Sequence, residues 1–88
     1  MENFTSYAPT HPGELLKDEL EARNMTQKEL ANRLNYSYSV INKVINGKRS
    51  FPTELAFLLE ELWGTKAYIW INLQSAYTLQ VTRSNDNS

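Results

Sequence analysis

The apolar positions of this 88-residue chain recur at helical spacing over most of its length. Apolar residues three or four positions apart share one face of an α-helix, so the pattern predicts an all-α domain. No segment shows the strict alternation expected of paired strands. The predicted helices span about 12–23, 27–34, 38–46, 54–63 and 66–82.

These helices form one domain at residues 10–82, between an N-terminal arm at 1–9 and a polar tail at 83–88. Pro12 suits the first turn of a helix, and Thr65 is expected to cap the last one. A chain of this size buries one modest core.

The second and third helices are joined by a tight turn. Thr26 and Glu29 have the spacing of a capping box, in which each side chain binds the other residue's backbone amide. Asn35 tolerates the left-handed conformation that a tight turn requires. Ser37 then caps the third helix and Gly47 ends it, so the segment reads as a helix-turn-helix.

The third helix has one apolar side and one polar side. Its apolar side comprises Val40, Ile41, Val44 and Ile45. Its polar side, which carries no acidic residue, comprises Tyr38, Ser39, Asn42, Lys43 and Asn46. Such a face suits insertion into a DNA major groove, although a polar face that only meets water has the same pattern.

The fifth helix is apolar around more than half of its circumference. One stripe comprises Ile69, Trp70, Leu73, Ala76 and Tyr77, and the opposite side carries Tyr68, Ile71 and Leu79. One small core cannot cover both faces, so we expect a homodimer interface formed by Trp70, Leu73 and Tyr77. Packing of the second face under the N-terminal arm is the alternative.

Composition excludes several classes of protein. There is no cysteine and only one histidine, His11, so we expect no metal site, and we expect His11 to cap a helix or face solvent. No paired acid and base or glycine-rich phosphate loop indicates an enzyme or a cofactor. No membrane span or signal peptide is evident, which predicts a cytoplasmic protein.

Charge is unevenly distributed although the net charge is only −1. Residues 1–30 carry six acidic and three basic residues, and residues 51–88 carry four acidic and two basic residues. Residues 31–50 carry four basic residues and no acidic one. The positive segment therefore coincides with the third helix and the loop after it, as expected of a DNA-contacting surface.

With these features the chain resembles the phage-repressor (XRE) helix-turn-helix superfamily, through the pattern TQxELAxxL…S…I…NG at 26–47. Within it, the chain is most similar to HigA-type antitoxins. The flanking segments that carry this similarity are PTHPGE at 9–14, NGKR at 46–49 and WINLQ with Ala76 and Tyr77 in the fifth helix. The fold implied is a five-helix, lambda-repressor-like domain. Asn35 departs from the family by replacing the usual turn glycine.

The resemblance implies a homodimer that binds an inverted-repeat operator in double-stranded DNA, represses its own operon and neutralises a HigB-type mRNA endonuclease toxin. A stand-alone repressor without a toxin is the alternative. The expected base contacts are Tyr38, Ser39, Asn42 and Lys43. The expected phosphate contacts are Gln27, Ser37, Asn46, Lys48 and Arg49.

An acidic face on the first helix is the expected toxin-binding surface, because a nuclease that acts on RNA is itself basic. The acidic residues concerned are Glu14, Asp18 and Glu21. Phe4 and Tyr7 of the arm would add apolar contacts. A solvated helix face has the same pattern, so both interpretations stay open.

Overall fold

A computed structural model describes residues 10–86. The elements are α1 (Pro12–Ala22), α2 (Gln27–Leu34), α3 (Tyr38–Ile45), α4 (Thr53–Trp63) and α5 (Ala67–Asp86). The predicted number of helices is confirmed within this part of the chain. The helix α5 continues past its predicted end at Thr82. The predictions for Phe4 and Tyr7 lie outside the described residues.

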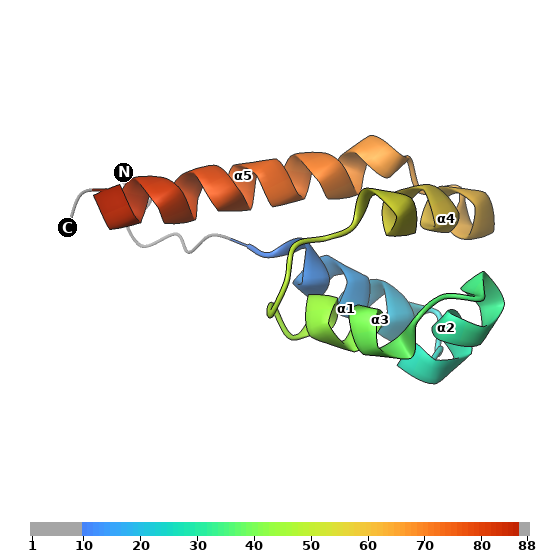
Figure 1. Ribbon diagram of the computed structural model, residues 1–88. Coiled ribbons are helices and arrows are strands. Elements are labelled where there is room, and N and C mark those ends of the chain that lie inside the picture. Colours follow the sequence, from blue (N-terminus) through green and yellow to red (C-terminus); the bar gives the residue numbers. More distant parts are fainter. Residues whose placement is uncertain (1–9, 87–88) are drawn as a thin grey trace.

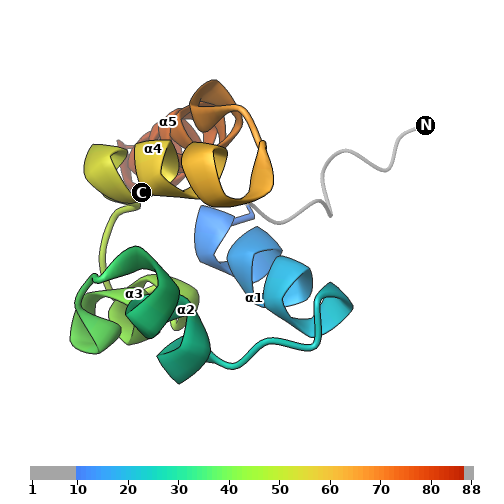
Figure 2. The ribbon, with the colours of Figure 1, turned by 90° about the vertical axis from the view of Figure 1, so that its right-hand side faces the viewer.

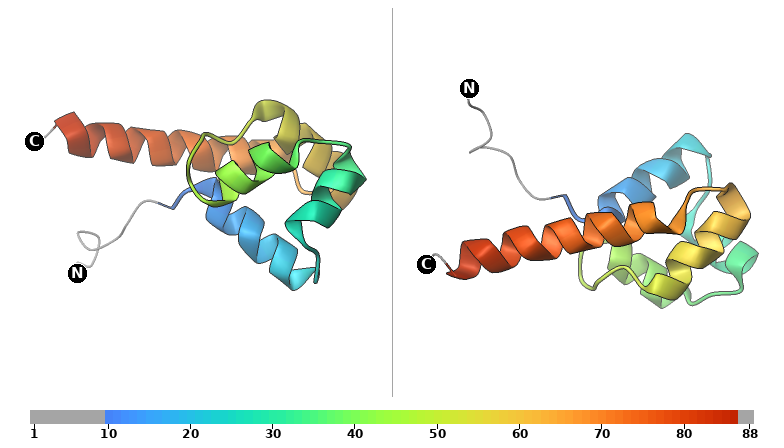
Figure 3. Two further views of the ribbon diagram at one scale, coloured as in Figure 1. Left: turned by 60° about the horizontal axis from the view of Figure 1, so that its bottom comes forward. Right: turned by 90° about the horizontal axis from the view of Figure 1, so that it is seen from above.

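The helices form two layers. In Figure 1, α4 and the first half of α5 lie above α1, α2 and α3, and Figure 2 shows the same separation from the side. The second half of α5 extends beyond the other helices in both views of Figure 3. Part of this long helix therefore has no other helix of the domain beside it.

One hydrophobic core joins the two layers. Its fully buried side chains from the lower layer include Leu16, Leu30, Ile41 and Val44. Leu55, Leu59 and Trp70 contribute from the upper layer. Phe51, in the loop before α4, stacks on Trp70 with ring centroids 4.9 Å apart and an interplanar angle of 12°. This stack anchors the connection between α3 and α4 to α5.

Local capping residues set most helix ends, as the sequence predicts. Gly64 ends α4 with a positive φ of 79°, a conformation that glycine adopts without strain. The start of α5 differs from the prediction, because the carboxylate of Glu60 on α4 accepts the Ala67 N–H at 2.8 Å. The cap is therefore a contact between two helices rather than the neighbouring Thr65 side chain.

Candidate nucleic-acid interface

The turn between α2 and α3 is formed by the residues that the sequence predicts. The capping box at the start of α2 is complete: Thr26 N–H donates to Glu29 Oε1 at 2.8 Å, and Glu29 N–H donates to Thr26 Oγ1 at 3.1 Å. Asn35 adopts the left-handed conformation with φ 51° and ψ 48°. The next amide, Tyr36 N–H, donates back to the Ala31 carbonyl at 2.9 Å. The Asn35 conformation and the Tyr36–Ala31 bond fix the angle at which α3 leaves α2, while the capping box fixes where α2 begins.

The outward face of α3 presents three of the four predicted base contacts to solvent. Ile41 and Val44 are fully buried and hold the opposite face of the helix against the core. Tyr38, Ser39 and Lys43 are exposed, and Tyr38 retains 44% of its accessible surface. A phenol, a hydroxyl and an ammonium group on one short helix match the chemistry of major-groove recognition.

Asn42 is placed differently from the other three predicted base contacts. Its side chain is half-buried, and its Nδ2 donates to Gln27 Oε1 at 3.0 Å. Its Oδ1 accepts from Asn46 Nδ2 at 3.3 Å. A bidentate contact to adenine uses both of these atoms, so Asn42 in this geometry joins α2 to α3 instead of presenting a free amide. The sequence pattern gave no sign of this, because Gln27 lies 15 positions away.

Two of the predicted phosphate contacts, Gln27 and Ser37, lie at helix starts. Gln27 uses Oε1 for Asn42, which leaves its NH2 group to donate elsewhere. Ser37 Oγ accepts the Val40 N–H at 3.2 Å and so acts as the α3 cap. The amides of Tyr38 and Ser39 lie in the first turn, where no acceptor exists within the helix. An anion at this position would be stabilised by those amides and by the helix dipole.

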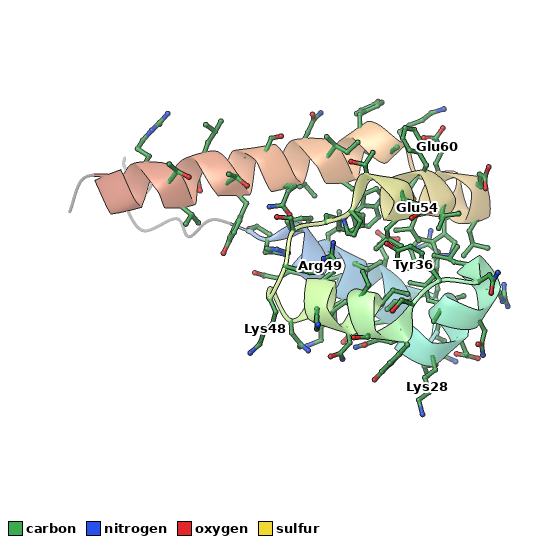
Figure 4. The ribbon with its side chains drawn as sticks, viewed as in Figure 1. Lys28, Tyr36, Lys48, Arg49, Glu54 and Glu60 are labelled. Atoms are coloured by element: carbon green, nitrogen blue, oxygen red, sulfur yellow. The ribbon has the colours of Figure 1, made fainter. Side chains whose placement is uncertain are left out.

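Basic residues also lie in the first turn of α2 and in the loop after α3. Lys28, Lys48 and Arg49 are exposed. In Figure 4, Lys28 and Lys48 project away from the upper layer, on the side of the molecule formed by α2 and α3. Lys28 was not among the predicted contacts, although its place directly after Gln27 at the start of α2 was a usable signal.

Arg49 is turned partly toward the protein. Figure 4 shows Arg49, Tyr36 and Glu54 along the space between the α3 and α4 ribbons. Burial raises the pKa of the Tyr36 phenol above 10.0, the negative charge of Glu54 raises that pKa further, and the positive charge of Arg49 opposes both effects. Both cations of this loop are exposed, and Arg49 is close enough to Tyr36 for its charge to act on the pKa of the phenol.

The predicted acidic residues of α1 border two different clefts. Glu14, Asp18 and Glu21 are exposed, as predicted. Glu14 and Asp18 line a cleft of about 300 Å³ together with Thr10, Leu15 and Leu73, whereas Glu21 lines a second cleft that includes Gln27 and Ile45. The first cleft joins α1 to α5 and combines carboxylates with apolar side chains.

The predicted dimer residues divide into two groups. Trp70 is fully buried within a single chain, so its side chain belongs to the core and offers no surface to a second copy. The prediction was wrong for Trp70, because α5 packs this side chain into its own domain, while the dimer contacts of Leu73 and Tyr77 stay predictions. Leu73 and Tyr77 are half-buried, while Tyr68 and Leu79 each retain 62% exposure on the opposite side of α5.

Two polar side chains outside the helix-turn-helix contact the loop after α3. His11 caps α1, as one of its two predicted roles, but it is only 6% exposed and also binds the Arg49 carbonyl. Gln74 on α5 binds the Phe51 N–H. Both residues lie in the flanking motifs, which was the available signal, but the contacts themselves span 38 and 23 positions.

Residues 16–68, more than half of the chain, match the helix-turn-helix family. A HigA-family addiction module antidote protein from Coxiella burnetii is 32% identical, with a TM-score of 0.86 over 92% of this chain and 89% of that chain. The chain belongs to the helix-turn-helix family, in its HigA branch.

Two further relatives have different described roles. Pseudomonas aeruginosa antitoxin HigA, solved with the higBA promoter, is 32% identical and has a TM-score of 0.84 over 90% of this chain and 87% of that chain. An uncharacterized HTH-type transcriptional regulator of Escherichia coli, YbaQ, is 36% identical over 88% of this chain and 69% of its own length. Similarity thus extends both to an antitoxin and to a regulator. Within residues 10–86, no helix has the length and apolar character needed to span a bilayer.

Proposed function

We propose that this chain is a DNA-binding antitoxin. In this proposal it binds an inverted-repeat operator as a homodimer, represses its own operon and neutralises a HigB-type mRNA endonuclease toxin. The observation that carries the DNA-binding part is the outward face of α3, where Tyr38, Ser39 and Lys43 are all exposed. Lys28 and Lys48 flank this face and supply charge for the phosphate backbone.

The homodimer is proposed to form through the exposed side of α5. Tyr68 and Leu79 are large apolar side chains with most of their surface in solvent. The second half of the helix, which carries Leu79, extends beyond the other helices, so a second copy can reach it without displacing them (Figure 3). To read two successive major grooves, a two-fold dimer must place its two α3 helices about 34 Å apart, one turn of DNA.

The toxin is proposed to dock on the acidic face of α1 and the cleft beside it. Glu14 and Asp18 supply charge complementarity to a basic nuclease, and Leu15 and Leu73 supply apolar surface. This face lies on α1 and α5, whereas the proposed DNA contacts lie on α2, α3 and the following loop. Separate surfaces allow toxin and DNA to be held at the same time.

Footprinting of the region upstream of the chain's own gene tests the DNA-binding part. We expect protection of an inverted repeat whose half-sites are about one helical turn apart. Absence of preference for any upstream sequence over nonspecific DNA would contradict the proposal.

A stand-alone repressor is the second candidate, and the similarity to a transcriptional regulator favours it. The gene beside this one separates the two functions. An adjacent reading frame for a small basic protein that this chain binds and inhibits supports the antitoxin, whereas operator binding without such a partner supports the repressor.

A further inference from the structure

The loop between α3 and α4 carries Lys48 and Arg49, and side chains from two other helices hold its backbone. His11, at the start of α1, places Nε2 3.0 Å from the Arg49 carbonyl oxygen. Gln74 on α5 places Oε1 2.8 Å from the Phe51 amide nitrogen. The backbone after Lys48 is thus bound at two positions, at Arg49 by the start of α1 and at Phe51 by α5.

The His11 contact has a defined direction. The Gly13 N–H donates to His11 Nδ1 at 2.9 Å, so Nδ1 is an acceptor and the ring proton lies on Nε2. Nε2–H therefore donates to the Arg49 carbonyl. His11 is 6% exposed, and its ring packs edge-to-face with that of Tyr77 on α5, with centroids 4.9 Å apart and an interplanar angle of 78°. One side chain thus connects α1, α5 and the basic loop.

Gln74 has both ends of its amide in use. Oε1 accepts from Phe51, and Nε2 donates to Thr78 Oγ1 at 3.1 Å. The Phe51 ring stacks on Trp70, one turn before Gln74 on the same helix. The end of the basic loop is therefore attached to α5 through both its backbone and its side chain.

We propose that His11 and Gln74 are positioning residues for DNA binding. They hold the backbone next to Lys48 in the conformation in which the Lys48 side chain can contact a DNA phosphate. This inference rests on the proposed DNA-binding function. A loop that is already ordered loses less conformational entropy when it binds, so its phosphate contact is stronger than that of the same lysine on a free loop. The link also joins the DNA-contacting loop to α5.

A double-mutant cycle separates positioning from simple stability. Gln74→Met has similar length but no acceptor for the Phe51 amide. Affinity for a duplex carrying the repeat protected upstream of the gene is measured in three backgrounds: wild type, Lys48→Ala with Arg49→Ala, and Lys43→Ala. We expect a loss of about 3- to 10-fold in the wild-type and Lys43→Ala backgrounds. In the background without the loop cations, the loss should shrink to less than about 2-fold.

A His11 pair provides a second route if Gln74→Met unfolds below the assay temperature. Asparagine is a good N-cap, so His11→Asn keeps an acceptor for Gly13, but it is too short to reach Arg49. His11→Ala loses both contacts. We expect His11→Asn, which keeps the α1 cap, to remain folded at the assay temperature by circular dichroism and still to lose operator affinity about 3- to 10-fold. His11→Ala should lower the unfolding temperature further, because it also loses the cap.

Equal losses in all three backgrounds, or wild-type affinity in His11→Asn, would overturn the positioning role. Both results can be distinguished from the result expected if the proposed DNA-binding function is wrong. If the wild-type chain prefers no operator sequence, DNA binding itself is rejected before any variant is compared.

Discussion

The backbone of Gly13 in α1 packs directly against the carbonyl group of Val44 in α3. A Cβ atom at position 13 would overlap the Val44 carbonyl oxygen, and no flexible side chain is there to move aside. The first turn of α1 therefore sets how closely the proposed recognition helix approaches the domain.

Gly13→Ala should destabilise the fold by about 1–3 kcal/mol or more, because α1 must move away from α3 to make room. Chemical denaturation monitored by circular dichroism measures this change. Glu14→Ala, at the exposed neighbouring position, is the control and should change the free energy of unfolding by less than about 0.5 kcal/mol. A Gly13→Ala variant with wild-type stability would show that α1 and α3 are not in direct backbone contact at Gly13 and Val44.

Substitutions of Trp70 and Leu79, which lie on opposite sides of α5, should affect different properties: the stability of the fold and the dimer, respectively. Trp70→Ala removes a fully buried ring and should cost about 3–5 kcal/mol of stability. Leu79→Asp places a charge on an exposed side chain and should yield a folded monomer. Sedimentation and circular dichroism distinguish the two outcomes. A wild-type monomer at tens of micromolar would reject the proposed dimer.

Lys43 and Lys48 should contribute to DNA binding in different ways. Lys43→Ala should weaken the free energy of operator binding by about 1–3 kcal/mol and relax the sequence preference at one base pair, because lysine on α3 can bind guanine O6 and N7. Lys48→Ala should weaken binding to all DNA sequences alike and should reduce the slope of log K against log salt concentration by about one unit. Binding titrations on operator variants at several salt concentrations test this division, which identical profiles would contradict.

Charge reversal on α1 should affect the toxin but not DNA. Glu14→Lys with Asp18→Lys should slow toxin association, most clearly at low salt, because both side chains are exposed beside the proposed toxin cleft and salt screens their attraction to a basic partner. Operator affinity should stay nearly unchanged. Glu54→Lys with Glu61→Lys, both exposed on α4, changes the net charge by the same amount and is the matched control. Toxin binding that survives reversal but is lost on truncation of α5 would move the site to α5.

Stability at high pH should depend on Tyr36. Burial and Glu54 raise the pKa of its phenol above 10.0 in the folded protein. As pH rises past about 10, unfolded chains lose this proton first, so the free energy of unfolding of the wild type should fall. Tyr36→Phe should show a smaller fall between pH 9 and 11 in urea titrations, with its value at pH 7 as the reference. Parallel pH profiles would exclude this contribution.

The sequence by itself determined the elements whose signals are local. Thr26 and Glu29, three residues apart, formed the predicted capping box, and Asn35 adopted the expected left-handed turn. Gly64 ended α4 as predicted. Capping and turn formation involve neighbouring backbone groups, so a short window of residues contains the necessary information. The separation of α3 into an apolar and a polar side was predictable for the same reason.

Only the tertiary structure decided how residues distant in the chain share contacts. Periodicity identified two apolar sides of α5, but only the packing of the domain showed that the Trp70 side is its core. The Asn42–Gln27, His11–Arg49 and Gln74–Phe51 bonds span 15, 38 and 23 positions. Residue type indicates that such amide and imidazole groups need partners, but the partner depends on how the helices pack.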